Sequence, residues 1–596
     1  SRGFDMRHHL LDLSVDPAIR AISGTVTHRV AATQDLGQVV LDLADALTVS
    51  SVLVDGQPAV FAHANDSLVV ELSPLLPEAE EASIAVTYSG VPPETGFGSF
   101  VQDEHEGAPI LWTLSEPYGA RDWWPCKQDL NDKADSLDVI ITTVSGNRAA
   151  SNGLLIAEDD LGNGTVRFHW RHRHPINHYL VAFAVTNYTV YSDVVPLASG
   201  DVEVLNYVFP ENLADAQGGT VNSISQMQLY SDLFGEYPFA DEKYGHAQFA
   251  WGGGMEHQTM SFMGGFHYEL VAHELAHQWF GDLVTCASWE DLWLNEGFAT
   301  YLSGLCYEFL APQYWMPFKS GRRGHITSQP GGSVLVTDTT SIPRLFDSRL
   351  TYAKGAYVLH MLRWVCGDDA FFEGVNNYLN DPEIRNRSAL TSQLIAHLET
   401  AAGSSLSEFM EDWYVGEGFP TYQLVWTQDI NGQVNAMLEQ TTSHPSVDFF
   451  EMPVPIRFEA DGQMETVILD HAFSGQTFSF PLPFQASAAQ LDPELWIVSG
   501  QNLVLKVPVA AFNDRESPLL YPNPATVDAW MHVGTRINGN VDLEVIDALG
   551  RVVLQRNATV ESMRVPVPSA MLASGTYTVR LLAENGLRIE LRLVKS

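Results

Sequence analysis

Two histidines and two glutamates within 24 residues constrain the fold of this chain more than any other feature. The run HELAH begins at His273 and ends at His277. On a helix, residues four apart share a face and lie about 6 Å apart along the axis, so both imidazoles can reach one metal ion. Glu296 can add the third ligand of an open, hydrolytic zinc site. The chain must therefore bring Glu296 back against the helix that carries the histidines.

The residues around these ligands predict two helices. Residues 268–280 and 289–301 each have apolar side chains at helical spacing, and packing the two together places all three ligands in one cleft. Glu274 then projects beside the metal, where a carboxylate acts as a general base. The alternative is a pair of buried helices whose histidines are ordinary core residues without a metal.

Length and charge bound the rest of the chain. At 596 residues it is too long for one core, and three or four domains are expected. Its 73 acidic and 32 basic residues give a net charge of -41, which argues against nucleic acid or an anionic membrane as a partner. No apolar run reaches the roughly 18 residues of a membrane span, and no signal peptide opens the chain. The protein is therefore expected to be either cytosolic or already processed.

Four cysteines are too few for a disulfide scaffold. They are Cys126, Cys286, Cys306 and Cys366. Two interpretations stay open: buried free thiols, or a bridge from Cys286 to Cys306 that brackets the Glu296 segment.

Changes in apolar periodicity predict a multidomain α+β protein. Residues 1–199 alternate as in a β-rich domain, and residues 200–418 contain longer helical patterns together with the metal motif. Alternation returns over residues 419–513, as in a β-sandwich of ordinary domain size. Residues 516–596 form a small all-β module, predicted as a second sandwich.

A second motif extends the metal pattern. Gly253-Gly254-Met255-Glu256-His257 places Glu256 seventeen residues before His273, and eighteen residues separate His277 from Glu296. In both motifs the chain resembles the aminopeptidase N and leukotriene hydrolase family of zinc metallopeptidases over residues 5–510. The resemblance implies a thermolysin-like, mainly helical catalytic domain and one zinc ion (Zn2+) per chain. A large helical fourth domain of many relatives is missing here.

The resemblance also implies roles for further residues. Tyr352, in a Tyr-x-Lys-Gly-Ala run, would stabilise the oxyanion of the reaction. Glu256 and Glu116 would bind the free amino terminus of a peptide, with Gly253, Gly254 and Met255 lining the substrate. The chain departs from the family pattern at His257, where asparagine is usual, and at Ser303, where many relatives carry glutamate.

The C-terminal module carries a signature of its own. It opens with YPNP from Tyr521, continues with an Asp-x-x-Gly-Arg turn from Asp547, and contains a late Gly-x-Tyr strand at Gly575. In these features it resembles the sorting domain of the bacterial type IX secretion system. This implies the secretion machinery as a partner, a secreted or cell-surface location, and removal of a signal peptide on export. An ordinary immunoglobulin-like appendage is the alternative.

The leading hypothesis is a secreted zinc aminopeptidase acting on peptides with a free N-terminus. A thermolysin-like endopeptidase shares the ligand types, but Glu256 and Glu116 argue against it. A catalytically silent surface-binding protein would be expected to have lost a ligand or the base, and here His273, Glu274, His277 and Glu296 are all present.

Overall fold

The computed structural model describes residues 2–596, apart from 510, 511, 513–517, 522, 526, 527, 535, 536, 538 and 561–563. The chain divides into two compact units, Ser1–Glu417 and Gly418–Ser596. The first unit holds every residue predicted for the active site. The domain boundary predicted between residues 513 and 516 lies largely outside the described residues, and Pro522 of the YPNP motif does so too.

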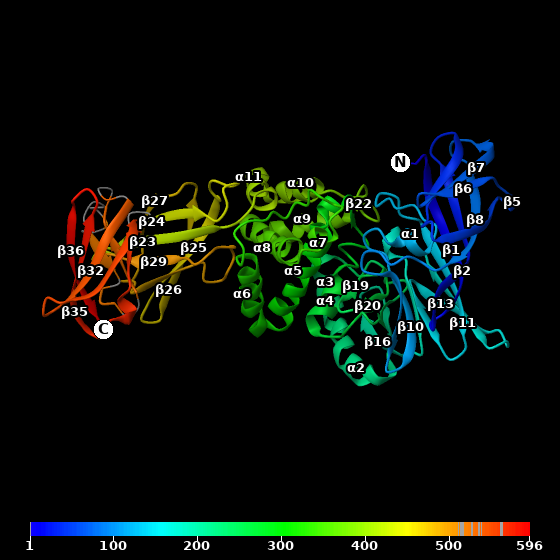
Figure 1. Ribbon diagram of the computed structural model, residues 1–596, viewed down its shortest axis with the longest axis horizontal. Coiled ribbons are helices and arrows are strands. Elements are labelled where there is room, and N and C mark those ends of the chain that lie inside the picture. The colour runs from blue at the N-terminus through cyan, green and yellow to red at the C-terminus, as the bar shows by residue number, and fades with distance from the viewer. Residues whose placement is uncertain are drawn as a thin grey trace. The chain divides into compact units, whose positions relative to one another are not determined.

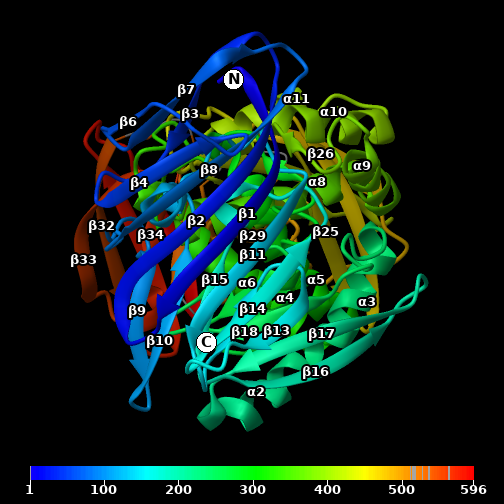
Figure 2. The same cartoon turned by 90° about the vertical axis from the view of Figure 1, so that its right-hand side faces the viewer.

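An eight-stranded sheet begins the first unit, and its long strands lie side by side in Figure 2. Across the sheet the order is β13 (Leu154–Asp160), β14 (Thr165–His172), β11 (Ser136–Val144), β1 (Phe4–Asp16), β2 (Ile19–Ala32), β8 (Glu81–Gly90), β4 (Leu47–Val54) and β5 (Gln57–Pro58). Only β1 and β11 pair in parallel among these neighbours. In β8 every second residue from Ala82 to Tyr88 is buried, as expected for a strand with one face on a core.

Smaller elements complete this β-rich region, which matches the prediction from alternation. One sheet has the order β12 (Arg148–Ser151), β15 (Phe183–Thr186), β10 (Ala108–Leu114) and β9 (Ser99–His105). Another has the order β3 (Leu36–Asp42), β7 (Ser67–Leu76) and β6 (Phe61–Ala64). The short helices are α1 (Ala120–Trp123) and the 3-10 turn η1 (His178–Leu180).

The metal motif lies in a mixed region, drawn mainly in green in Figure 1. A five-stranded sheet has the order β16 (Thr189–Pro196), β17 (Asp201–Val208), β18 (Tyr244–Gln248), β20 (Ser261–Met263) and β19 (Gly254–Met255). A short pair, β21 (Thr285–Cys286) with β22 (Ser388–Ala389), is parallel. The boundary predicted at residue 199 falls inside the β16–β17 hairpin and stays a prediction.

Helices make up most of the remainder of this region. They are α2 (Leu213–Thr220), α3 (Asn222–Phe234), α4 (Tyr268–Ala276), α5 (Trp293–Leu310), α6 (Trp315–Ile326), α7 (Ile342–Leu345), α8 (Gly355–Cys366), α9 (Asp368–Asn380), α10 (Thr391–Ala402) and α11 (Ser407–Met410). The 3-10 turns are η2 (Pro210–Asn212), η3 (Trp289–Asp291) and η4 (Pro312–Tyr314), and η5 (Ser348–Lys354) and η6 (Glu411–Val415) are π-helical.

Helix α5 is the buried centre of this region. Every residue from Trp293 to Cys306 is buried, which is typical of a helix that is apolar around its whole circumference. Gly297 on α5 faces Gly355 at the start of α8, where a Cβ added to Gly297 would lie 3.1 Å from the carbonyl carbon of Gly355. The two glycines therefore let α5 and α8 approach closely.

Two predictions about this region need correction. The helix expected over residues 268–280 ends at Ala276, and residues 277–279 form a turn before the chain reaches Phe280. The helix expected over residues 289–301 begins as the 3-10 turn η3 and then runs as α5 to Leu310, because apolar residues continue beyond the predicted end.

The cysteines settle the alternative left open by the sequence. All four are free thiols, and only Cys366 is partly exposed. The bridge from Cys286 to Cys306 is absent. Cys286 lies in β21, whereas the Cys306 sulfur lies 3.1 Å from the Tyr230 hydroxyl.

The second unit consists mainly of β-strands in its described part. In its first part, one sheet has the order β27 (Gln476–Pro481), β24 (Gln433–Thr442), β23 (Pro420–Gln428) and β29 (Leu503–Lys506). A second sheet has the order β26 (Gln463–His471), β25 (Met452–Ala460) and β28 (Ala488–Leu491). In the C-terminal module, one sheet has the order β30 (Leu519–Tyr521), β31 (Ala529–His532) and β34 (Arg564–Val567). The other has the order β33 (Val552–Val560), β32 (Gly539–Asp547), β35 (Gly575–Ala583) and β36 (Arg588–Lys595). The 3-10 turn η7 (Ser569–Met571) also belongs to this module.

The predicted Asp-x-x-Gly-Arg turn joins β32 to β33. Asp547 Oδ1 accepts hydrogen bonds from the backbone N–H groups of Leu549 and Arg551, both at 2.9 Å. The Arg551 side chain donates to Asp547 Oδ2 at 2.8 Å. The motif thus closes its own turn, which accounts for its spacing. Across the part of the chain that the structure describes, no helix combines the length and apolar character needed to span a bilayer.

Candidate functional site

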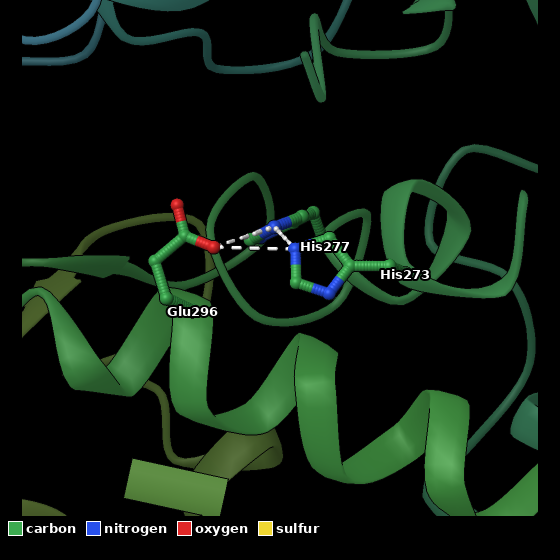
Figure 3. Close-up of side chains that lie close together, drawn as sticks. All are labelled: His273, His277 and Glu296. Carbon is green, nitrogen blue, oxygen red and sulfur yellow. Dashed lines mark hydrogen bonds and ion pairs between the residues drawn. The ribbon is translucent and has the colours of Figure 1, made fainter. Parts of the chain in front are cut away.

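The three predicted metal ligands meet in the first unit. His273 lies in the last turn of α4, His277 follows at its C-terminal end, and Glu296 lies in the first turn of α5. Figure 3 shows one Glu296 oxygen directed at both imidazole rings. His277 Nε2 lies 3.1 Å from His273 Nε2, and Glu296 Oε2 lies 3.2 Å from His273 Nε2 and 3.4 Å from His277 Nε2.

These distances fit a zinc ion. With bonds of about 2.0–2.1 Å, tetrahedral ligands lie about 3.3 Å apart, close to the spacing of the three atoms. His277 Nδ1 lies 3.0 Å from the carbonyl oxygen of Phe280, which can only accept. Nδ1 therefore carries the proton and Nε2 keeps its lone pair for a metal. The turn that ends α4 early is thus what supplies this carbonyl.

The ligands are electrostatically coupled. Burial alone would raise the pKa of Glu296, but the charge of His277 and the hydrogen bond with His273 lower it to about 2. Burial would lower the pKa of His277, yet the charges of Glu256 and Glu296 raise it well above its ordinary value. Without a metal, the two carboxylates therefore favour the protonated His277 ring, and a zinc ion would displace the proton from its Nε2. The ionised carboxylate and two neutral imidazoles are then a donor set suited to zinc.

The predicted base lies beside this cluster. Glu274 is 3% exposed, and burial holds its pKa well above the ordinary range. Its carboxylate lies against Gly254, where an added Cβ would be 2.2 Å from Glu274 Oε1. Gly254 is in β19, which pairs with β20 so that Met255 lies opposite Phe262. Gly254 is therefore the residue that leaves room for the Glu274 carboxylate.

Tyr352 reaches the cluster from the π-helix η5. Its ring stacks near His273 with centroids 6.0 Å apart. Burial, followed by the charge of Glu296, raises the pKa of Tyr352 well above its ordinary value, so its hydroxyl keeps its proton. Tyr352 lies three residues before Gly355 and Glu296 lies directly before Gly297, so the close approach of these two glycines brings the two segments together. A protonated phenol facing the metal ligands can donate a hydrogen bond to an oxyanion.

Two further carboxylates face the same space. Glu256 and Glu116 are 2% and 4% exposed, and the Oε1 atom of each is buried without a hydrogen-bond partner. Burial, opposed by the charge of His277, raises the pKa of Glu256 to about 7. Burial and the charge of Glu256 raise the pKa of Glu116 well above its ordinary value. Glu256 Oε1 lies 4.0 Å from His277 Nδ1, too far for a hydrogen bond, so both oxygens are open as hydrogen-bond acceptors for a cationic group brought by a ligand.

One cavity of about 660 Å³ joins all of these groups. It is lined by all ten residues predicted for the site, including Gly253, Gly254 and Met255. It is also lined by residues that the sequence analysis did not identify, among them Phe97, Trp251, His267, Glu269, Thr300, Arg322, His325 and Phe346. Glu269 could have been found from helical spacing, one turn before His273, whereas Phe97 and Arg322 have no local signal.

The two departures from the family pattern are also buried. His257 is fully buried, its ring lies 4.3 Å from that of Phe262, and neither ring nitrogen has a hydrogen-bond partner. Ser303 is fully buried on α5, and its hydroxyl donates to the carbonyl oxygen of Thr300 at 2.8 Å. Neither residue lines the cavity.

Comparison with known proteins identifies the family. The peptidase M1 N-terminal domain matches residues 5–180, and the peptidase family M1 domain matches residues 266–413. The chain belongs to peptidase family M1. The secretion system C-terminal sorting domain matches residues 519–596 of this M1 chain, which suggests export or a cell-surface location in a bacterium.

Relatives of the M1 chain include aminopeptidases. It is 28% identical to aminopeptidase N of Lactobacillus delbrueckii subsp. lactis over 453 residues, which cover 70% of the chain and 51% of that protein. It is 35% identical to aminopeptidase N of Oryctolagus cuniculus over 219 residues, which cover 33% of the chain and 22% of that protein. Some curated relatives match most of this chain, and the chain spans about half the length of those relatives.

Solved M1 structures share the fold. An M1 zinc metallopeptidase of Deinococcus radiodurans, a mutant bound to a Tyr-Ser-Ala substrate, superimposes with a TM-score of 0.61 and 27% identity, covering 69% of this chain and 94% of that one. A two-domain M1 zinc metallopeptidase mutant bound to L-arginine gives a TM-score of 0.59 and 28% identity, covering 68% of this chain and 92% of that one. The family and fold predictions are thereby confirmed, and zinc is the metal of these neighbours.

Proposed function

We propose that this protein is a zinc aminopeptidase that removes the first residue from peptides with a free N-terminus. The observation that carries this proposal is the pair of buried, unpartnered oxygens, Glu256 Oε1 and Glu116 Oε1, in the same cavity as the metal ligands. A substrate ammonium would pair with both, whereas a blocked terminus would leave two buried acceptors unpaired. The aminopeptidase relatives support the same activity.

The proposed mechanism assigns one step to each residue. A zinc ion held by His273, His277 and Glu296 would supply Lewis acidity, which polarises the substrate carbonyl and makes water nucleophilic near neutral pH. Glu274 takes the proton of the attacking water and returns it to the leaving amine. Tyr352 donates a hydrogen bond to the carbonyl oxygen as that oxygen gains negative charge. Glu256 and Glu116 fix the amine, so that only the first peptide bond reaches the metal ligands.

The C-terminal module supports a proposal about location. We infer that the protein is secreted through, or displayed by, the type IX secretion machinery of a bacterium, because the matched sorting domain spans residues 519–596. The substrates would then be peptides outside the cell.

The experiment that tests the activity compares one peptide with a free and with an acetylated N-terminus. The wild-type protein should hydrolyse the free form and lose that activity with a zinc chelator. Glu256→Ala should lower kcat/KM on the free peptide by about 10²-fold, a typical loss when one partner of a desolvated charge pair is removed.

Glu236→Gln is the matched control, since Glu236 is an exposed carboxylate outside the cavity that accepts from the Ser199 amide. It should behave as wild type. Efficient cleavage of internal bonds in the acetylated peptide by the wild-type protein would replace the proposal with an endopeptidase.

A further inference from the structure

Three aromatic rings form one wall of the cavity. Phe97 lies 5.4 Å from Trp251 and 4.9 Å from Phe346 between ring centroids. All three side chains are partly exposed and line the cavity. Apolar surface that stays exposed inside a binding cavity is surface that a ligand can cover.

The wall lies beside the two unpartnered carboxylates. Gly96, next to Phe97, lies between the carbonyl oxygen of Glu116 and the side chain of Ile342, each 3.8 Å from an added Cβ. This contact brings Phe97 against Phe346, which follows α7. The Phe97 end of the aromatic wall thus lies next to the backbone of Glu116 and to α7.

Trp251 connects the wall to the other carboxylate. Its ring covers Gly253, where an added Cβ would lie 2.7 Å from Trp251 Cζ3. Gly253 leads directly into β19 and Glu256. A glycine at position 253 therefore leaves room for the indole beside β19, the strand that directly precedes Glu256.

Another part of the cavity lining is charged. Glu269 and Arg322 form an ion pair, and His325 Nε2 lies 3.2 Å from the Ser348 hydroxyl. Glu269 lies one turn before His273 on α4, so this part adjoins the metal ligands. The cavity lining therefore includes an aromatic cluster near the segments of Glu116 and Glu256 and a charged cluster one turn from His273 on α4.

In the proposed aminopeptidase reaction, the first side chain of the substrate branches from the carbon between the amine and the scissile carbonyl. We propose that Phe97, Trp251 and Phe346 bind this side chain and select peptides that begin with a large apolar or aromatic residue. This inference rests on the proposed function. An aromatic first side chain would be stabilised by the burial of its apolar surface and, in addition, by offset and edge-to-face contacts with the three rings.

The test is a panel of aminoacyl 4-nitroanilides with Phe, Leu, Ala, Lys or Glu as the first residue. The wild-type kcat/KM for the Phe substrate should exceed that for the Ala substrate by about tenfold or more, because added apolar groups that fit a hydrophobic pocket raise kcat/KM by this order. Calorimetry on the zinc-loaded Glu274→Gln variant should show tighter binding of phenylalaninamide than of alaninamide. This second measurement requires no turnover.

Variants assign the preference to the wall. Trp251→Ala and Phe346→Leu should each reduce the Phe-to-Ala ratio several-fold, whereas Trp251→Phe should keep most of it. The matched control is Phe309→Ala, because Phe309 is 46% exposed and lies outside the cavity. It should leave the ratio at the wild-type value.

Three outcomes would overturn the inference. A Lys substrate that is faster than Phe would mean that the rings bind a cation through their faces. An Ala substrate as fast as Phe would mean that the wall does not contact the first side chain. In both cases aminopeptidase activity itself would stand, whereas no hydrolysis of any free-amine substrate would overturn the proposed function together with this inference.

Discussion

At the level of single residues, Gly254 controls the position of the proposed base. The Glu274 carboxylate occupies the space that any side chain at position 254 would need, with Oε1 only 2.2 Å from an added Cβ. Catalytic groups must be held closely, and a displacement of 1 Å can lower a rate by about 10²-fold. A small residue without chemistry of its own thus limits where the general base can act.

Gly254→Ala is therefore expected to lower kcat by about 10-fold or more, because its methyl group must displace the Glu274 carboxylate. Zinc content should remain one ion per chain, measured by atomic absorption. Gly252→Ala is the control from the same glycine run, since nothing lies within 4 Å of an added Cβ there. Equal activity of the two variants would contradict this account of Gly254.

Glu274→Gln should lower kcat by about 10²-fold or more while zinc stays bound, because the proton acceptor is lost and the ligands are kept. Single-turnover assays with zinc analysis on the same samples check both statements. Wild-type turnover in this variant would remove Glu274 from the proposed mechanism.

At the level of elements, one buried histidine–carboxylate hydrogen bond joins the N-terminal sheet to the strand region of the site. His172, at the end of β14, lies with Nδ1 2.6 Å from Glu242 Oε2, and both side chains are fully buried. His172 Nε2 accepts a hydrogen bond from Gln258, two residues after Glu256. Burial would raise the pKa of Glu242, but the hydrogen bonds from His172 and from the Arg173 backbone amide lower it to about 2.

The lowered pKa of Glu242 gives a pH-dependent stability. Because the folded-state pKa lies below the unfolded value near 4.5, the stabilisation is complete above about pH 4.5 and is lost as the pH falls towards 2. Glu242→Gln should reduce the free energy of unfolding at pH 7 by about 3 kcal/mol. In urea titrations the difference from wild type should shrink below pH 4.5, and a difference that grows there would contradict this prediction.

At the level of the whole molecule, the first unit contains both matched M1 domains and the entire cavity. Its last residues are held within the unit, where Lys354 donates to the carbonyl oxygen of Gly416 at 3.1 Å and Glu417 accepts from the Gly332 amide at 2.7 Å. The unit therefore has its own core and a secured C-terminal end.

Residues 1–417 produced alone are accordingly expected to fold and to keep kcat/KM within a few-fold of the full chain. Circular dichroism and the free-amine peptide assay check this directly. The full chain without residues 516–596 is the intermediate control and should also be active. An inactive but folded 1–417 protein would show that the second unit contributes to the site.

Much of the fold and site followed from local patterns. Alternation predicted the β-rich regions, and helical periodicity placed His273 and His277 on one face. The spacing from these histidines to Glu296 predicted the third metal ligand. Helix ends were less accurate: α4 stops at Ala276 because the following turn places the Phe280 carbonyl on His277, a contact with no helical signal.

The ligand types, their spacing and the family were readable from the chain because they depend on residues close in sequence or on a recurring motif. The aromatic wall of Phe97, Trp251 and Phe346 was not, since its members come from three distant segments that meet only when the first unit folds. The same holds for the unpartnered oxygens of Glu116 and Glu256, whose isolation results from burial by surrounding segments. Periodicity records which way a side chain points within an element, whereas long-range packing sets what it faces.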